Sequence, residues 1–180
     1  MKKGTLLILD DDPGRHEFFT TAASDYDVVH TYEVTTFAEA VKETKELVLV
    51  SLDHDLTAGA NRGRSVKGCG CDAAELVNQH VAAHIPVLIH SANDMGSQAM
   101  RAILVRAGRS GRVSRMNFET IMDQDERAGI TLFGDAVAEL TANPCWPDDV
   151  TSDELIALLG DNPWATCPTR AAKEAAWRSR

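Results

Sequence analysis

The sequence contains no apolar run long enough to cross a membrane. Its longest apolar stretches, such as Leu6–Leu9 and Leu47–Val50, have the length of strands, whereas a membrane-spanning helix needs about 20 apolar residues. The run that follows Met1 and two lysines ends at Asp10 and is too short for a secretory signal peptide. We therefore expect a cytoplasmic protein that does not act at a membrane.

Cysteine is scarce, and the spacing of the four cysteines does not favour a metal site. Cys69 and Cys71 are separated by one residue, whereas structural zinc sites usually pair cysteines with two to four residues between them. Cys145 and Cys167 are isolated. Without a secretory signal, disulfides are not expected either. The sequence predicts four reduced thiols and no structural zinc.

Charge is unevenly distributed along the chain. Residues 1–56 and residues 117–180 each carry 5 basic and 12 acidic side chains, a net charge of −7, whereas residues 57–116 carry 8 basic and 3 acidic side chains, a net charge of +5. The basic side chains of the middle segment are Arg62, Arg64, Lys67, Arg101, Arg106, Arg109, Arg112 and Arg115. They form either a solvated face that balances acidic surfaces elsewhere or a local attraction site for anions. The overall charge of −9 argues against binding to duplex DNA, which needs many phosphate contacts.

Short apolar runs alternate with helical patterns over the first two thirds of the chain. The expected elements are strands at Thr5–Leu9, Val28–Tyr32, Leu47–Leu52, Pro86–Ile89 and Arg112–Phe118, and helices at Arg15–Ala23, Thr36–Lys45, Ala73–Ala83 (opened by an Asp72–Glu75 capping box) and Gln98–Ala107. Continuous apolar strands that alternate with helices predict an α/β fold with a doubly wound, parallel, five-stranded sheet. The second strand is the weakest and is expected near an edge. Ligands of such sheets bind at the carboxyl ends of the strands.

Beyond residue 120 the pattern becomes helical. An apolar stripe contains Leu132, Phe133, Ala136, Val137 and Leu140, and Thr151 and Glu154 form a capping box before a further short helix. We therefore divide the chain into an α/β domain over residues 1–120 and a helical C-terminal extension over residues 121–180. The sequence indicates neither the role of the extension nor the oligomeric state.

Acidic residues follow two of the expected strands. Asp10, Asp11 and Asp12 come directly after the first strand, and Asp53 and Asp55 flank His54 after the third. Adjacent carboxylates repel one another, so a nearby cation is expected, and oxygen ligands at this density suit Mg²⁺ or Mn²⁺. The alternative is an acidic turn that caps the next helix, which we expect for Asp12 in particular.

Histidines stand at two strand ends. His54 lies between two carboxylates, which orient a ring and favour its use as an acid or base. His90 precedes Ser91, Asn93 and the start of the next helix, where small polar groups and helix amides bind anions. Because the third and fourth strands are expected to be neighbours, His54 and His90 would face each other across a phosphate as base and acid. Alternatively, His90 merely packs at the end of its strand.

These motifs resemble the cyclic-phosphate processing receiver family. The matching segments are Leu9–Asp11, Ser51–Leu56, Ile89–Asn93 and Gly96–Met100, which together extend over about the first 118 residues. The resemblance implies a receiver-like (flavodoxin-like) fold and chemistry on a cyclic phosphate, in a nucleotide signal or at an RNA end. It also suggests a role in bacterial or phage nucleotide-signal conflict.

One feature of ordinary response-regulator receivers is missing. Those receivers carry a lysine after the fifth strand, whereas this chain has no lysine between Lys67 and Lys173. The acidic pair, the acceptor aspartate and the Ser/Thr position are filled by Asp10, Asp11, Asp53 and Ser91. The missing lysine argues against a phosphorelay switch, and His54 and His90 are what the resemblance implies instead.

The leading hypothesis is therefore a phosphodiesterase that hydrolyses a cyclic phosphate in a nucleotide or at a 2′,3′-cyclic phosphate RNA end. The expected cation ligands are Asp10, Asp11 and Asp53, for Mg²⁺ or Mn²⁺. The expected catalytic residues are His54, His90, Asp53 and Asp55, with Asp55 orienting His54. The expected phosphate-binding groups are Ser91, Asn93, the Gly96 amide, Arg62 and Arg64.

Two other functions fit the same residues. A receiver-like module without catalytic activity would use the anion site to capture a nucleotide or a protein partner. A haloacid-dehalogenase-like phosphatase would use Asp10, Asp12 and Ser91 as its first motifs. The chain lacks a convincing lysine and a late acidic pair for that chemistry, so the phosphatase ranks last.

Overall fold

The computed structural model describes residues 1–56, 68–109, 113–116 and 126–142. Five parallel strands form one sheet in the order β2-β1-β3-β4-β5, with β2 at an edge as predicted. The strands are β1 (Thr5–Leu9), β2 (Asp27–Thr31), β3 (Leu47–Leu52), β4 (Val87–His90) and β5 (Val113–Met116). The helices are α1 (Pro13–Ala22), α2 (Val34–Glu43), α3 (Gly70–His80), α4 (Asp94–Leu104), its π-helical continuation η2 (Val105–Arg109) and α6 (Glu126–Ala142). The predicted doubly wound, receiver-like fold is confirmed.

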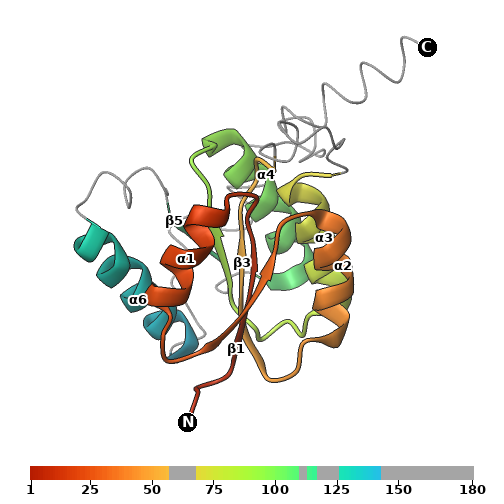
Figure 1. Cartoon of the computed structure of the whole chain (residues 1–180). Helices are drawn as coiled ribbons and strands as arrows, with labels where there is room; N and C mark the ends of the chain where they lie inside the picture. The colour runs from red at the N-terminus through yellow and green to blue at the C-terminus, as the bar shows by residue number, and fades with distance from the viewer. Residues whose placement is uncertain (57–67, 110–112, 117–125, 143–180) are drawn as a thin grey trace.

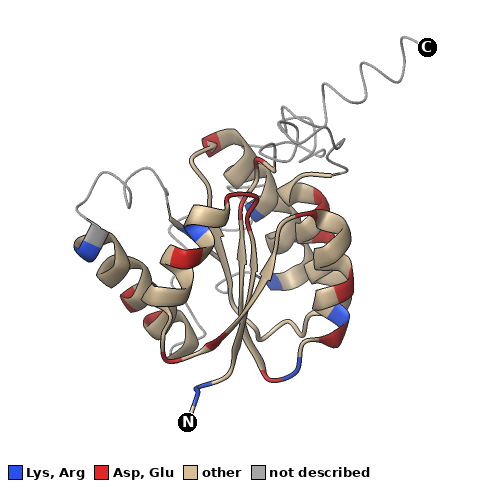
Figure 2. Cartoon of the chain, in the orientation of Figure 1, with Lys and Arg blue, Asp and Glu red and all other residues tan. Residues whose placement is uncertain are grey.

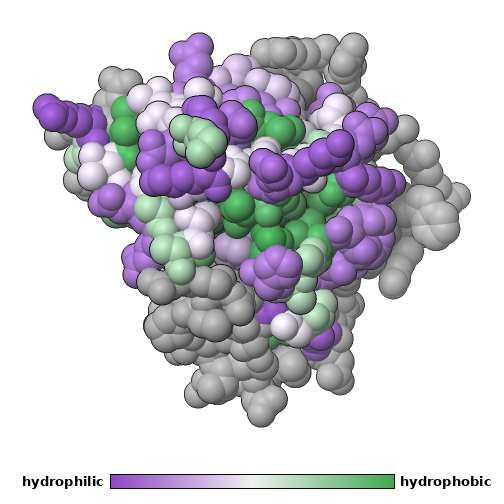
Figure 3. Space-filling view, turned by 90° about the horizontal axis from the view of Figure 1, so that it is seen from below, coloured by the Kyte–Doolittle hydropathy of each residue, from purple (hydrophilic) through white to green (hydrophobic). Residues whose placement is uncertain are grey.

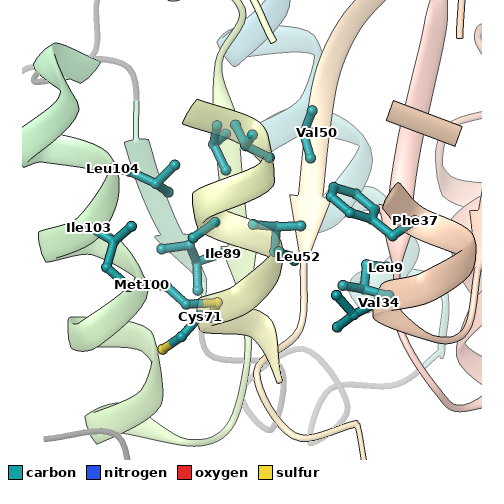
Figure 4. Packing of buried hydrophobic residues seen from close by; sticks show 14 of the residues in the cluster. Leu9, Val34, Phe37, Val50, Leu52, Cys71, Ile89, Met100, Ile103 and Leu104 are labelled. Carbon is teal, nitrogen blue, oxygen red and sulfur yellow. The ribbon is translucent and has the colours of Figure 1, made fainter. Parts of the chain in front are cut away.

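Helices cover both faces of the sheet (Figure 1) because successive strand residues point to opposite sides. Leu7 and Leu9 pack with α2, α3 and α4 in one buried cluster, part of which Figure 4 shows. Leu6 and Ile8 pack with α1 and α6 in the other. All four leucine and isoleucine side chains are fully buried, as expected for a parallel strand with both faces covered.

All four helices predicted before residue 110 begin earlier than expected, and the side chains of Asp12 and Asn93 cap two of them, α1 and α4. Asp12 accepts a hydrogen bond from the Gly14 N–H at 2.8 Å, which confirms its predicted role as a cap. Helix α3 begins at Gly70, three residues before the predicted start, and the N–H of Cys69 donates to Asp72 Oδ2 at 2.8 Å. The predicted capping box from Asp72 to Glu75 was therefore wrong, since Asp72 lies inside the first turn.

Helix α6 packs into the same core as the sheet. Its buried side chains Phe133, Val137 and Leu140 belong to the cluster that contains Phe19 of α1, and the Phe19 and Phe133 rings lie 4.9 Å apart. The first helix of the predicted extension is thus part of the sheet's hydrophobic core. Residues 143–180, including the predicted Thr151–Glu154 capping box, lie outside the described residues. In the described ranges, no helix has both the length and the apolar character needed to cross a membrane.

The two ends of the sheet differ in chemistry. At the amino ends of the strands, seen in Figure 3, apolar side chains gather at the centre of the surface and hydrophilic ones surround them. At the opposite end, acidic residues lie in the loops that leave the strands (Figure 2). That end also holds buried polar side chains, among them Asp10, Asp53, His54 and His90. The carboxyl ends of the strands are therefore where a site is expected.

Candidate functional site

Three carboxylates meet at the carboxyl ends of β1 and β3. One oxygen each of Asp10, Asp11 and Asp53, the carboxylate trio, lies within 4.8 Å of the others. The trio forms because β1 and β3 are adjacent, and the N–H of Asp53 still donates to Leu9 O at 2.9 Å just beyond the paired residues. Asp10 and Asp53 are 0% and 2% exposed. The predicted clustering of these aspartates is therefore present.

Arg15 supplies positive charge to the trio, a role that the sequence reasoning missed. From α1, its Nη2 lies 3.0 Å from Asp10 Oδ1, 3.2 Å from Asp11 Oδ1 and 3.4 Å from Asp53 Oδ2. A guanidinium is always charged and offers several donors, so it offsets the repulsion between the carboxylates. The signal was in the sequence, because Arg15 is the first basic residue after the acidic run and lies four residues from Asp11.

Burial raises the pKa of Asp53, and the nearby charge of Asp10 raises it further. His90, Arg15 and a hydrogen bond from Ser91 act in the opposite direction. The backbone N–H of His54 also donates to Asp53 Oδ1 at 2.7 Å. Asp53 is thus a buried acid whose ionised form depends on the charges and donors around it.

His90 belongs to the same network. Its Nε2 lies 3.0 Å from Asp10 Oδ2, and its Nδ1 lies 2.7 Å from Ser51 Oγ. The ring is fully buried and stands edge-on to Phe19, with the ring centres 4.9 Å apart. Both ring nitrogens therefore have oxygen partners inside the protein. Ser51, at the end of β3, is a second member of the network that the sequence reasoning missed.

His54 is held by a different set of partners. Its Nδ1 lies 2.7 Å from Asp55 Oδ1, and Asn93 Nδ2 donates to the two Asp55 oxygens at 3.1 and 3.0 Å. The His54 ring packs against Gly96 so closely that any side chain at position 96 would collide with it. His54 is fully buried, whereas the Asp55 side chain is 45% exposed. An acid that orients a histidine in this way is the arrangement expected of an acid–base group.

The predicted phosphate-binding groups have partners within the protein. The Ser91 hydroxyl bonds Asp53 and accepts the N–H of Asn93 at 3.2 Å. The Gly96 N–H donates to Asn93 Oδ1 at 2.8 Å and so serves to cap α4. The predicted anion ligands Arg62 and Arg64 lie outside the described residues.

Arg109, one of the basic residues of the middle segment, has a structural role. It is 2% exposed. It donates to the backbone oxygen of Val77, in the last turn of α3, at 3.2 Å and to that of Ile85, beyond the end of α3, at 3.1 Å. Burial lowers the pKa of its guanidinium. Arg115 pairs with Asp94 at 2.9 Å. For Arg109, both predicted interpretations, a solvated face and an anion attraction site, were wrong.

One protein family matches most of the α/β part of the chain. The family described as "Cyclic-phosphate processing Receiver domain" matches residues 5–106, which is more than half of the chain. That range contains Asp10, Asp53, His54 and His90. No curated protein matches the chain.

Solved structures with the same fold are distant in sequence. The RcsB response regulator of Salmonella typhimurium is 15% identical, with 89% of this chain and 71% of that chain covered and a TM-score of 0.51. A response regulator from Burkholderia pseudomallei, solved with a phosphorylated aspartic acid, a calcium ion and citrate, is 16% identical, with 95% and 93% covered and a TM-score of 0.47. An adenylate cyclase from Rhodopirellula baltica is 15% identical, with 77% and 95% covered and a TM-score of 0.47. Of these three, only the RcsB match has a TM-score above 0.5, and at 15% identity it shows the fold alone.

Proposed function

The chain belongs to the cyclic-phosphate processing receiver family, and from this premise we propose that it is a phosphodiesterase that opens a cyclic phosphate. The substrate would be a cyclic nucleotide signal or a 2′,3′-cyclic phosphate at an RNA end. One observation supports the proposal above all others: His90 bonds Asp10 at 3.0 Å, within a buried carboxylate trio. The positions that characterise an ordinary phosphorelay receiver include no histidine, whereas hydrolysis of a phosphodiester needs groups that move protons.

His54 is the proposed general base. Because its Nδ1 bonds Asp55, the opposite ring nitrogen, Nε2, would take the proton of a water molecule that attacks phosphorus. The new P–O bond forms as the bond to the leaving ribose oxygen breaks. Asp55 would stabilise the imidazolium that results, as an orienting carboxylate does in other acid–base pairs.

His90 is the proposed general acid. It would give a proton to the leaving oxygen, so that the proton removed from water at one histidine is balanced by the proton delivered at the other. Both His90 nitrogens bond oxygens of Ser51 and Asp10. The leaving oxygen would therefore replace one of these partners when substrate binds.

The carboxylate trio fits a divalent cation. Its oxygens lie within 4.8 Å of one another, and carboxylate oxygens are the ligands that Mg²⁺ and Mn²⁺ prefer. A bound cation would offset negative charge that develops on the phosphate. Ser91, Asn93, the Gly96 N–H, Arg62 and Arg64 remain the proposed phosphate ligands.

A binding module without turnover is the second candidate. It is favoured by the observation that His54 and His90 are both 0% exposed and already have protein partners. Arg15 also supplies a positive charge to the trio. A site whose polar and charged groups already have partners within the protein suits recognition of a partner as well as catalysis.

Incubation of the full chain with a panel of substrates separates the two candidates. The panel contains cyclic mononucleotides, cyclic dinucleotides and RNA with a 2′,3′-cyclic phosphate end, and chromatography detects ring-opened products. We expect one class to be converted with multiple turnovers. Tight binding of a nucleotide without any product would instead favour the binding module.

A further inference from the structure

A second group of metal-binding side chains lies beside the proposed base. One ligand atom each of His54, Cys69 and Cys71 lies within 4.8 Å of the others. The three residues are 0%, 2% and 0% exposed. This thiol–imidazole cluster combines two soft sulfur ligands with a nitrogen, whereas the carboxylate trio offers only oxygens. The two groups therefore suit different metals.

Gly70 explains how two cysteines separated by one residue come to share His54. The Gly70 N–H donates to His54 O at 3.0 Å, which joins the start of α3 to the end of β3. A Cβ atom at position 70 would lie 2.7 Å from His54 Cα and 2.5 Å from Met100 Sδ, so only glycine permits this approach. The cysteines on either side of Gly70 are consequently brought to the histidine. The spacing of the two cysteines disfavoured zinc because it does not reveal the third ligand, His54, which follows strand β3.

The dimensions of the cluster are compatible with tetrahedral coordination. Ligand atoms at the usual Zn–S and Zn–N distances of about 2.3 and 2.0 Å lie about 3.5–3.8 Å apart around the ion. The separations in the cluster, at most 4.8 Å, need to shorten by at most about 1.3 Å to match that size. Cys69 and Cys71 also stand at the amino end of α3, where the helix dipole stabilises negative charge and thus a thiolate.

The partners of His54 match those of a metal-bound histidine. Ligating histidines almost always bond a carboxylate through the ring nitrogen that does not face the metal. In this chain Nδ1 lies 2.7 Å from Asp55 Oδ1, and Asn93 in turn donates to both Asp55 oxygens. The arrangement assigns Nε2 as the coordinating atom and Asp55 as the residue that orients the ring.

We propose that His54, Cys69 and Cys71 form a zinc site separate from the carboxylate trio. Binding would release the two thiol protons and leave one coordination position for a water or an anion. A consequence rests on the proposed function: zinc on Nε2 would prevent His54 from accepting a proton, so zinc would inhibit hydrolysis.

Cobalt(II), a spectroscopic substitute for zinc, provides the test. The full chain, reduced and free of metal, is titrated with Co²⁺ under anaerobic conditions. We expect one equivalent to produce thiolate-to-cobalt charge-transfer absorption, and Zn²⁺ to abolish it. The band should be lost in Cys69→Ser and Cys71→Ala and kept in the control Cys145→Ser/Cys167→Ser. Asp55→Asn should keep the band but weaken Zn²⁺ binding by about 10–100-fold, as loss of an orienting partner does.

The absence of charge-transfer absorption in the folded wild type would overturn the proposal, as would a band that survives in both Cys69→Ser and Cys71→Ala. Circular dichroism establishes that each variant is folded, and serine at position 69 retains a side chain suited to a helix N-cap. The readout is binding, so it does not depend on turnover. A chain that binds Co²⁺ through these thiols but converts no substrate would leave the zinc site standing and contradict only the proposed hydrolysis.

Discussion

Arg15 Nη2 lies 3.4 Å from Asp53 Oδ2, although the two residues are 38 positions apart in the chain. The same nitrogen lies 3.0 Å from Asp10 Oδ1. One guanidinium therefore contributes positive charge where three carboxylates converge. A divalent cation at the trio would have to share these oxygens with Arg15 or displace it.

The first prediction concerns Arg15→Gln. Removing one partner from a buried group of charges is costly, because the remaining charges lose their compensation. We expect the free energy of unfolding to fall by up to about 3–5 kcal/mol without divalent cations, and Mg²⁺ to restore part of it. Denaturant unfolding with and without Mg²⁺ measures both effects. The exposed Arg127 of α6 provides the control, and equal stability of Arg127→Gln and Arg15→Gln would contradict the assignment.

The second prediction is that acetyl phosphate leaves no stable acyl phosphate on Asp53. No lysine occurs between Lys67 and Lys173, so the lysine that follows the fifth strand in ordinary receivers is missing. Intact-mass spectrometry after treatment should show the unmodified chain. Addition of one phosphoryl group, abolished by Asp53→Asn, would instead restore a signalling function.

The third prediction concerns the cation. If the carboxylate trio holds a catalytic ion, a chelator should abolish the hydrolysis found with the substrate panel, and Mg²⁺ or Mn²⁺ should restore it. Zn²⁺ should not restore the activity, because we expect it to bind His54 through the thiol–imidazole cluster. Activity that persists in the chelator, with a bell-shaped pH profile, would favour a mechanism with two histidines and no cation.

The fourth prediction concerns the two histidines. Loss of a general acid or base typically costs 10²–10⁴-fold in rate, so His54→Ala and His90→Ala should each lower turnover within about that range. Nucleotide binding should persist, since Ser91 and Asn93 remain. The exposed His84 provides the control, and His84→Ala should have the wild-type rate. Wild-type turnover by the two buried-histidine variants would show that the catalytic assignment is wrong.

The parallel sheet could be predicted because its evidence is local. The three central strands, β1, β3 and β4, are largely apolar runs, and the polar residues at their carboxyl ends are adjacent to those runs in the sequence. Parallel strands place such ends at one edge, so the meeting of Asp10 and Asp53 followed from topology. The helix starts were less predictable, because a cap depends on which polar side chain turns back to the backbone.

The contacts that were missed join distant parts of the chain. Arg15, in the helix that follows β1, contacts Asp53, which follows the neighbouring strand β3. Cys69 and Cys71 lie near His54 only because Gly70 allows α3 to approach the end of β3. Residue spacing carries no information on such contacts. For this reason the cysteine spacing argued against zinc at Cys69 and Cys71, and the sequence did not reveal the hydrogen bond between Ser51 and His90.

The fifth prediction concerns the stability of the fold at low pH. His16 Nδ1 lies 2.5 Å from His30 Nδ1, and His16 Nε2 lies 2.7 Å from the Asp10 carbonyl oxygen. A carbonyl only accepts, so His16 Nε2 carries a proton and, in the neutral ring, Nδ1 accepts from His30. Protonation of His16 would set two N–H donors against each other. Burial lowers the pKa of both histidines. The charge of His16 lowers the pKa of His30 further, and the charges of His90 and Arg15 lower the pKa of His16 against the opposite effect of Asp10.

Because these lowered pKa values mean that the unfolded chain binds more protons than the folded chain, the free energy of unfolding should fall as the pH drops below the ordinary histidine value of 6.5. Asp53 acts in the opposite direction, since its raised pKa makes the folded chain retain a proton as the pH rises above 3.8, the ordinary pKa of an aspartate.

Comparison with His30→Gln isolates the histidine pair, because Asp53 is unchanged. Denaturant unfolding between about pH 7.5 and about pH 5.5, the range in which histidines titrate, should show a smaller loss of stability in His30→Gln than in the wild type. His84→Gln should retain the wild-type dependence, and an identical dependence in His30→Gln would mean that the pair does not control stability at low pH.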